Sequence, residues 1–356
     1  MKLSISEKFR DPDLVRSLVE ELQSWEKPVK LMEVCGSHTM AIGHWGLRKL
    51  LPSSITLLSG PGCPVCVTPY SVIDSIMNLK DVTIATFGDL IRVPGRNGSL
   101  EQSRARGLDV RIVYSPFDAL EMAKKKETVF IGIGFETTSP GVAYTIKQAA
   151  EKKIKNFSVL PAFKIIPPAL EALADDKDIS IDAFILPGHV SAILGSEPYR
   201  VLSEKYRTGG VVTGFEPLDI LNGIRMLLRQ IQEKDPRIEI EYKWVVHKDG
   251  NPQAKAILDE IFTVEDSLWR GIGKINRSGL TIRDEFSDYN ALKKYNLTLP
   301  EKDDFDKGCR CGDVLKGKII PKECPLFKVK CTPENPIGAC MVSSEGSCAA
   351  YYKYEE

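Results

Sequence analysis

Short apolar runs alternate with helix-like segments over most of this sequence, and this alternation restricts the possible folds more than any other feature. The runs that we expect to be strands lie at 29–34, 55–59, 82–87, 110–114, 128–133, 157–160, 183–186 and 210–213. The segments between them carry apolar residues at helical spacing, as at 39–51 and 142–152. Strands that alternate with helices are typical of a parallel sheet covered by helices. The sequence therefore predicts an α/β fold.

The alternation starts again near residue 127, which predicts two lobes. We expect Rossmann-like parallel-sheet lobes at 28–126 and 127–233, each of a common domain size, with a cleft between them. After Pro300 the chain is rich in Lys, Gly, Pro and Cys. Such a segment buries little apolar surface and would need a metal to hold its shape. We expect residues 234–356, together with an N-terminal helix within 1–27, to form a smaller iron–sulfur cluster domain.

The charge and composition exclude several classes of protein. The 356 residues include 48 Lys and Arg and 48 Asp and Glu, so the formal net charge is zero and neither nucleic acid nor an anionic membrane is an expected partner. The first residues lack the apolar core of a signal peptide, and no apolar run approaches the roughly 20 residues of a membrane helix. We therefore expect a cytoplasmic protein. Nine cysteines in such a protein indicate metal or redox chemistry.

The cysteines fall into two groups that are far apart in the chain. Cys35, Cys63 and Cys66 each follow an expected strand closely, and the other six lie between 309 and 348. Ligands bind at the carboxyl ends of the strands in an open α/β sheet. The first group therefore predicts a site where a single thiol, a Cys-x-x-Cys pair and imidazoles meet.

The pair Cys63 and Cys66 has the spacing of a reversible disulfide, in which thiols of low pKa are common. The preceding Gly-Pro-Gly turn permits close approach of a ligand. The alternative is a zinc site in which Cys35 and His38 complete the ligand set. We favour a redox pair beside a separate metal-binding thiol, Cys35, with His38 as a second candidate ligand. A lone cysteine after a strand can also be a small buried apolar residue, and His44 is as easily a surface residue as a ligand.

Four C-terminal cysteines have the spacing C-x14-C-x6-C-x16-C, namely Cys309, Cys324, Cys331 and Cys348. Four thiolates can hold one iron–sulfur cluster or one zinc ion. The spacing is wide for a zinc ribbon, which usually has two tight cysteine pairs. We therefore favour an iron–sulfur cluster over structural zinc. Cys311 and Cys340 are left over, either as free thiols or as a disulfide.

Polar residues also follow the strands expected in the second lobe. They are Glu136, His189 and Glu216, and Asp89 has a similar place in the first lobe. A single polar residue after a strand is commonly a helix cap. Several together indicate a cleft with acid–base or ligand-orienting groups, of which we favour Glu136 and His189. The glycines nearby do not form a G-x-G-x-x-G fingerprint, so no dinucleotide is expected.

These motifs together resemble those of the HypD family of nickel–iron hydrogenase formation proteins. The matching motifs are C-G-S-H-T at 35–39, G-P-G-C-P-V-C at 60–66, G-F-E-T-T at 134–138, P-G-H-V-S at 187–191, G-F-E-P-L-D-I at 214–220 and the spaced C-terminal cysteines. The resemblance extends in order over nearly the whole chain. It implies a redox-active assembly scaffold rather than a conventional turnover enzyme. With the HypC chaperone, the scaffold assembles an iron carrying two cyanides and one carbon monoxide, Fe(CN)2CO. The HypE–HypF pair supplies the cyanide, and the hydrogenase large subunit receives the product.

The resemblance also implies roles for individual residues. Cys35 would hold the iron. Cys63 and Cys66 would be a redox pair that exchanges electrons or thiols with a 4Fe–4S cluster, whose ligands would be Cys309, Cys324, Cys331 and Cys348.

One position departs from the family pattern. Some members have a second histidine where this chain has Met40, which weakens the case for two imidazole ligands in that loop. The alternative function is a cluster-dependent thiol–disulfide reductase that resembles ferredoxin–thioredoxin reductase. In a third reading, both thiol sites hold structural zinc.

Overall fold

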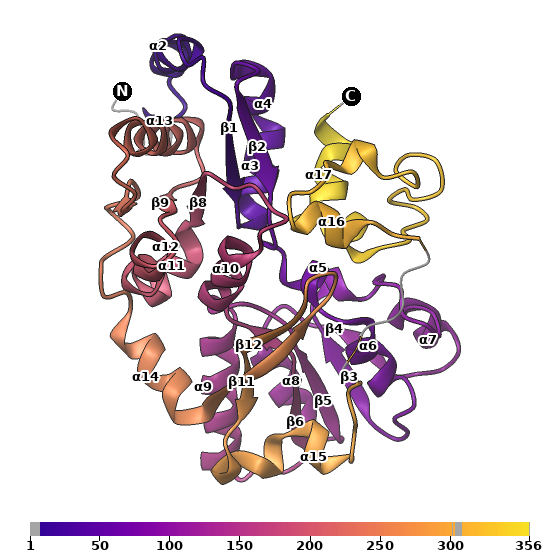
Figure 1. Ribbon diagram of the computed structural model, residues 1–356. Coiled ribbons are helices and arrows are strands. Elements are labelled where there is room, and N and C mark those ends of the chain that lie inside the picture. Colours follow the sequence, from indigo (N-terminus) through magenta and orange to yellow (C-terminus); the bar gives the residue numbers. More distant parts are fainter. Residues whose placement is uncertain (1–7, 301, 303–307, 356) are drawn as a thin grey trace, which may run out of the picture.

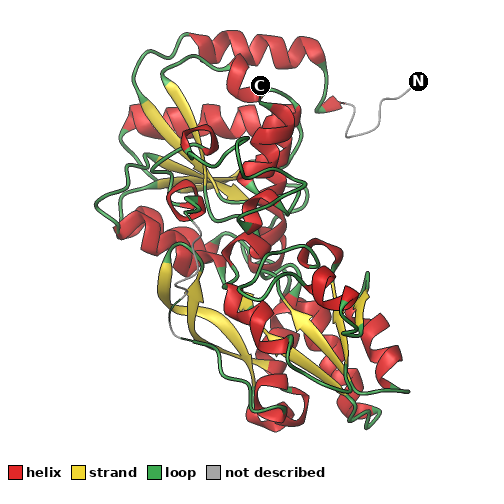
Figure 2. Ribbon diagram, turned by 90° about the vertical axis from the view of Figure 1, so that its right-hand side faces the viewer, coloured by secondary structure: helices red, strands yellow, loops and turns green. Residues whose placement is uncertain are grey.

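The computed structural model describes residues 8–300, 302 and 308–355. Figure 1 shows an upper α/β part, a lower α/β part and a smaller C-terminal part beside the upper one. Figure 2, turned by 90°, shows the same separation of an upper and a lower group of strands. The expected mixed α/β fold with two parallel sheets is confirmed, and the smaller iron–sulfur cluster domain stays a prediction.

The upper sheet has five parallel strands in the order β10-β9-β8-β1-β2. Their bounds are β1 (Val29–Glu33), β2 (Ile55–Ser59), β8 (Ala183–Pro187), β9 (Gly209–Thr213) and β10 (Ile238–Ile240). In β8 and β9 every residue is buried, as expected of parallel strands that are covered on both faces. The helices of this part are α2 (Pro12–Gln23), α3 (Gly36–His44), α4 (Leu47–Leu50), α11 (Gly188–Leu194), α12 (Arg200–Glu204) and α13 (Pro217–Glu233).

The lower sheet has four parallel strands in the order β4-β3-β5-β6. Their bounds are β3 (Thr83–Thr86), β4 (Val110–Ile112), β5 (Thr128–Gly132) and β6 (Phe157–Pro161). The helices around it are α6 (Tyr70–Ile76), α7 (Leu100–Ala105), α8 (Pro116–Ala123), α9 (Ser139–Glu151), α14 (Pro252–Ile261) and α15 (Ala291–Lys294). Two further helices, α5 (Pro64–Val67) and α10 (Ile166–Asp175), lie where the upper and lower parts meet (Figure 1).

The two sheets divide the chain differently from the expected lobes 28–126 and 127–233. The chain completes β1 and β2, leaves for the whole lower sheet, and returns to the upper sheet at β8. Each expected lobe therefore contributes strands to both sheets. The physical reason is that an apolar run identifies a buried strand but does not specify the sheet that the strand joins.

The segment 234–356 is also more dispersed than expected. β10 joins the upper sheet, and an antiparallel hairpin, β11 (Phe262–Trp269) and β12 (Gly273–Ile282), pairs with the short β7 (Phe163–Lys164). The expected N-terminal helix is present as α2, but it packs against α13 of the upper part. Only the stretch from 308 onward forms a separate C-terminal part, which contains α16 (Cys311–Leu315), η4 (Pro321–Glu323), η5 (Ala339–Met341) and α17 (Ser347–Tyr354).

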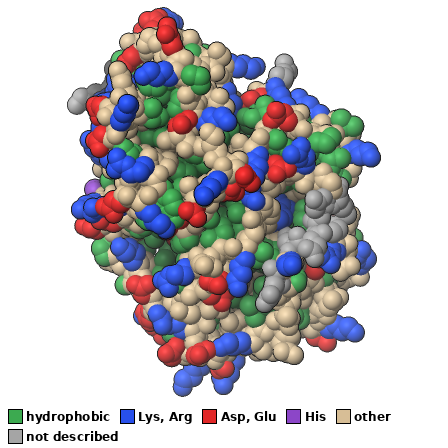
Figure 3. Space-filling model, in the orientation of Figure 1, with side chains coloured by type: hydrophobic (Ala, Val, Ile, Leu, Met, Phe, Trp, Pro, Cys, Tyr) green, Lys and Arg blue, Asp and Glu red, His purple; other side chains and the backbone are tan. Residues whose placement is uncertain are grey.

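Charges of both signs are mixed on the face of the molecule shown in Figure 3. This agrees with the balanced composition. Within the described residues, no helix is both long enough and apolar enough to cross a membrane.

Candidate functional site

Cys35 lies at the carboxyl end of β1, immediately before α3, and its side chain is buried. The loop after β2 is pressed against it: the Gly36 N–H donates to the Gly62 carbonyl at 2.8 Å, and the Gly60 N–H donates to the Glu33 carbonyl at 2.7 Å. A Cβ at Gly62 would overlap the backbone of Cys35, so only glycine fits there. The structure therefore brings together the two N-terminal motifs that the sequence predicted to meet.

A buried carboxyl group supports this loop. The Glu33 side chain is fully buried and accepts hydrogen bonds from Thr39 Oγ1 at 2.5 Å and from the Cys35 N–H at 3.2 Å. Burial raises the pKa of Glu33 to about 7. Burial, with the charge of Glu345, raises the pKa of Cys35 to about 12. A cation bound at the Cys35 sulfur would counteract burial and the charge of Glu345, and would therefore favour the Cys35 thiolate. Sequence analysis missed Glu33, although an acidic residue inside an apolar strand is a usable signal.

His38 is buried one turn after Cys35. Its Nε2 lies 2.9 Å from both the Gly214 carbonyl and Thr213 Oγ1, at the end of β9. A proton on Nε2 that is donated to the carbonyl leaves the lone pair on Nδ1, and Nδ1 is buried without a hydrogen-bond partner. Metal-bound histidines usually donate their other ring N–H to such a carbonyl. Burial lowers the pKa of His38 to about 4, which keeps the ring neutral.

Cys63 and Cys66 form a disulfide at the start of α5. Both residues are buried, with 3% and 0% of their surface exposed. The Cys66 N–H donates to the Cys63 sulfur at 3.1 Å. Helix α5 packs directly against η5, which contains Cys340. The disulfide therefore lies between the Cys35 loop and the C-terminal cysteines.

Five of the six C-terminal cysteines interact with one another or share neighbours. The sulfurs of Cys309 and Cys311 are 3.1 Å apart, and Cys348 hydrogen-bonds to Cys311. A Cβ at Gly338 would lie 2.5 Å from the Cys309 sulfur and 2.8 Å from the Cys311 sulfur. The remaining members of this group are Cys331 and Cys340: burial and the charges of Cys309 and Cys311 raise the pKa of Cys331, and Cys340 lies close enough to Cys348 to act on it.

The sixth cysteine, Cys324, is half-buried beside η4 and packs against the apolar cluster that contains Cys331 and Cys348. Cys311, which the expected ligand set leaves out, contacts two of its members, Cys309 and Cys348.

The buried cation Arg270 lies between the disulfide segment and this thiol group. Its backbone N–H donates to the Val67 carbonyl at 2.7 Å, and one guanidinium nitrogen lies 3.9 Å from the Cys340 sulfur. Burial alone would lower the pKa of Arg270, but the charges of Tyr70 and the nearby thiols raise it above its ordinary value. Sequence analysis did not identify this residue.

The soft donor set of the C-terminal thiols, with a cation beside it, suits a thiolate-bound metal cluster. Over residues 8–300, 302 and 308–355, however, no group of three or more His, Cys, Asp or Glu side chains has the arrangement of a metal-ion site. The four expected ligands, Cys309, Cys324, Cys331 and Cys348, therefore stay a prediction.

Glu136 and His189, the two favoured cleft residues, lie in different surroundings. Glu136 is buried, accepts a hydrogen bond from the Ile166 N–H at 2.9 Å and leaves its second oxygen without a partner. Burial raises the pKa of Glu136 to about 7. His189 is exposed and stacks on Phe215 with a 4.0 Å centroid distance, and the ring of His38 lies 4.7 Å from the same phenylalanine.

Two further polar residues have other roles. Glu216 caps α13, accepts hydrogen bonds from Arg10 at 2.5 and 2.7 Å, and is thus explained by the helix-cap reading. Asp89 is exposed in a short 3-10 helix, η1 (Gly88–Leu90). Sequence analysis also missed Tyr199, a buried tyrosine whose pKa is raised by burial and by the charges of Glu136 and Cys35.

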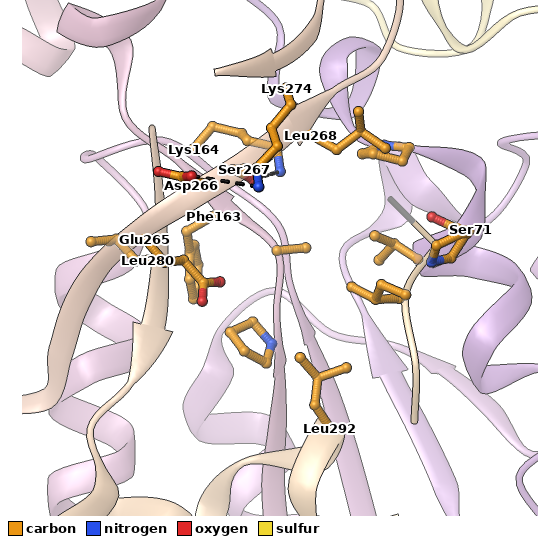
Figure 4. Close-up of a pocket in the computed structure, with 16 residues that line it drawn as sticks. Ser71, Phe163, Lys164, Glu265, Asp266, Ser267, Leu268, Lys274, Leu280 and Leu292 are labelled. Atoms are coloured by element: carbon orange, nitrogen blue, oxygen red, sulfur yellow. Dashed lines mark hydrogen bonds and ion pairs between the residues drawn. The ribbon is translucent and has the colours of Figure 1, made fainter. Parts of the chain in front are cut away.

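A cavity of about 280 Å³ lies apart from these thiols, between the β11–β12 hairpin and the start of α6 (Figure 4). Lys164 lines it and donates to Ser267 Oγ at 2.6 Å, and burial lowers the pKa of Lys164 to about 8. None of the candidate thiols lines this cavity.

Comparison with known proteins gives one consistent result. The family described as "HypD: Hydrogenase formation hypA family" matches residues 13–355. The hydrogenase maturation factors HypD of Escherichia coli and Rhodobacter capsulatus are each 42% identical to this chain, over 98% and 99% of it and 98% of each of those proteins. A putative hydrogenase expression/formation protein of Methanocaldococcus jannaschii is also 42% identical, over 97% of this chain and 98% of that protein.

Proposed function

This chain belongs to the HypD family of hydrogenase maturation factors, and we propose that it is the scaffold on which the Fe(CN)2CO unit of a nickel–iron hydrogenase is assembled. In this proposal the iron is the cargo, and Cys35 holds it. The HypC chaperone works with the scaffold, HypE with HypF donates cyanide, and the hydrogenase large subunit receives the finished unit. The protein thus acts as a redox-active scaffold rather than as a conventional turnover enzyme.

The observation that carries this proposal is the direct backbone contact between the Cys35 loop and the Cys63–Cys66 loop. Cyanide and carbon monoxide favour low-spin Fe(II), and a soft thiolate suits that ion. The neighbouring pair can store electrons, because two thiols release two electrons and two protons when they form a disulfide. An iron on Cys35 would therefore lie beside a two-electron reservoir.

Three further side chains would give the proposed site additional properties. In this proposal His38 supplies its free Nδ1 as a second ligand or as an acceptor. Glu136 has a pKa near 7 and can exchange a proton close to neutral pH. His189, on the same Phe215, lines the approach to the site.

The resident cofactor would be a 4Fe–4S cluster on Cys309, Cys324, Cys331 and Cys348, and its chemistry is one-electron transfer. The chain's own part is to bury Cys331 and Cys348, to cover Cys309 and Cys324 partly, and to bring the Cys340 segment against the disulfide helix. Electrons could then pass between the C-terminal part and the Cys63–Cys66 pair over a short, dry path.

The alternative function, a thiol–disulfide reductase, is less well supported. Such an enzyme must present a sulfur to the disulfide of a partner protein. Here Cys63 and Cys66 are only 3% and 0% exposed. Burial of this degree suits an internal redox pair.

The test is infrared spectroscopy of the protein purified anaerobically with HypC. We expect bands in the cyanide and carbonyl region for the wild type and none for Cys35→Ala, with the iron–sulfur content of the two equal. His44→Ala is the matched control, because His44 lies exposed at the other end of the same helix. Cyanide bands that persist in Cys35→Ala would contradict the proposal, and zinc in place of iron and sulfide would return both thiol sites to a structural role.

A further inference from the structure

Arg270 is the only arginine that is buried among the residues that the structure describes. It follows the last residue of β11, and 6% of its surface is exposed. The guanidinium lies 4.8 Å from the centroid of the Tyr70 ring and 3.9 Å from the Cys340 sulfur. Its Nη1 is buried without a hydrogen-bond partner, and no carboxylate among the described residues forms an ion pair with it.

The surroundings of Arg270 differ from those of Arg48. Arg48 also lies over a tyrosine ring, 4.6 Å from the centroid of Tyr351, but it is paired with the Glu355 carboxylate at 2.5 Å. A buried cation is strongly unfavourable unless an opposite charge compensates it. Arg48 has that compensation from a carboxylate, whereas the groups that face Arg270 are Tyr70 and thiols.

The thiols next to Arg270 can supply the missing charge only as thiolates. Neutral thiols are weak hydrogen-bond acceptors, whereas metal-bound cysteines are deprotonated. A cluster or a zinc ion bound by four thiolates carries net negative charge. Among the thiols whose charges act on Arg270, Cys309 is a proposed ligand, whereas Cys311 and Cys340 lie beside the proposed ligand set. The position of Arg270 therefore suits a thiol group in which Cys309 is bound to metal.

We propose that Arg270 is the built-in counter-cation of the C-terminal thiol group and holds that group, in its metal-bound and negatively charged form, against the Cys63–Cys66 segment. The contact with the disulfide segment is made by the backbone of Arg270, whose N–H donates to the carbonyl of Val67, next to Cys66. Arg270 is thus a positioning residue for both redox sites. The inference rests on the proposed function only in that the C-terminal thiols bind a metal.

Two consequences distinguish this role from simple packing. A nearby cation favours the more negative, reduced form of a cluster, so it raises the reduction potential. It also slows metal release, because release leaves the cation uncompensated. A residue that served packing alone would change neither property when an apolar side chain of similar length replaced it.

The experiment compares full-length wild type, Arg270→Met, Arg270→Lys and the control Arg48→Met, all purified anaerobically. Iron, sulfide and zinc per chain, the rate of metal release to a chelator and the midpoint potential of the cluster are measured. We expect Arg270→Met to release metal several-fold faster and to have a more negative potential than the wild type. Arg270→Lys should lie between them, and Arg48→Met should match the wild type in both properties.

The outcomes separate this inference from the proposed function. Wild-type release rate and potential in Arg270→Met would overturn the role of Arg270. If Arg270→Met does not fold, a folded Arg270→Lys that has lost its metal would overturn it, because that variant keeps the charge. Zinc in the wild type would contradict the proposed function. The role of Arg270 would then be tested by whether Arg270→Met releases zinc faster than the wild type. A wild type without any bound metal would overturn the inference itself.

Discussion

Cys35 follows a strand that is paired on both sides, whereas Cys309 lies in a part of the chain that is held by short helices and turns. β1 lies between β2 and β8, and the loops after β1 and β2 are tied by backbone hydrogen bonds. In the described stretch 308–355 the only bridge between extended segments joins Phe327 and Cys331. The first site is shaped by the backbone before any ligand arrives. The second has many sulfurs but little regular structure, and its shape should depend on what the sulfurs bind.

The largest effect should come from Gly62→Ala, which disturbs the backbone around Cys35, the first of the two sites. The new Cβ would overlap the backbone of Cys35, and relief of that overlap would disturb the hydrogen bond from the Gly36 N–H to the Gly62 carbonyl. We expect the free energy of unfolding to fall by about 4 kcal/mol or more. Denaturant unfolding measures this.

Gly141→Ala is the control for that change, because a Cβ at Gly141 meets no atom within 4 Å and the residue lies in helix α9. It should be neutral or slightly stabilising, by up to about 1 kcal/mol. Equal effects of the two substitutions would mean that the first site is not held by its backbone.

A smaller effect is expected from Glu136→Gln, and it should depend on pH. The folded pKa of Glu136 is raised from 4.5 to about 7, so the ionised carboxylate is penalised in the folded state. The wild type should lose stability as pH rises from about 4.5 to about 7, by roughly 3 kcal/mol, since one pKa unit corresponds to 1.36 kcal/mol.

The glutamine variant lacks this titration. It should therefore be more stable than the wild type above pH 7 and similar to it at pH 4. Because the carboxyl is buried by the fold, the same difference is expected with and without bound metal. A difference in the free energy of unfolding between the wild type and Glu136→Gln that does not change with pH would contradict this prediction.

The smallest change in stability is expected for Gly338→Ala, which places a methyl group against the C-terminal thiols, the second of the two sites. Its Cβ would lie 2.5 Å from the Cys309 sulfur, an atom at the end of a side chain that can rotate away. We expect the free energy of unfolding to change by less than about 1 kcal/mol. Iron and sulfide per chain should nevertheless fall, because Cys309 is a proposed ligand. Full iron content in this variant would show that the second site is also fixed before loading.

The sequence predicted the individual strands well because each is a short apolar run that is buried on both faces. β1, β2 and β8 lie within a residue of their expected bounds. It did not predict which strands share a sheet, since an apolar run carries no information about its neighbours. The β11–β12 hairpin was missed because its exposed residues, such as Glu265 and Lys274, interrupt the apolar pattern.

The candidate site shows the same limit. Motif spacing brought Cys35, Cys63 and Cys66 together correctly, because they follow adjacent strands. The thiol contacts of Cys311 and the burial of Arg270 arise from the packing of η5 and the C-terminal turns, which leave no periodic signal in the sequence.

The interruption of the upper sheet by the lower one has a consequence for the order in which the protein is made. Cys35 leaves the ribosome early, but β8 and β9 are translated only after the whole lower sheet. The carbonyl of Gly214, which positions His38, comes later still. The lower sheet can therefore fold first during synthesis. The surroundings of Cys35 and His38 therefore stay incomplete until more than half of the chain has been translated.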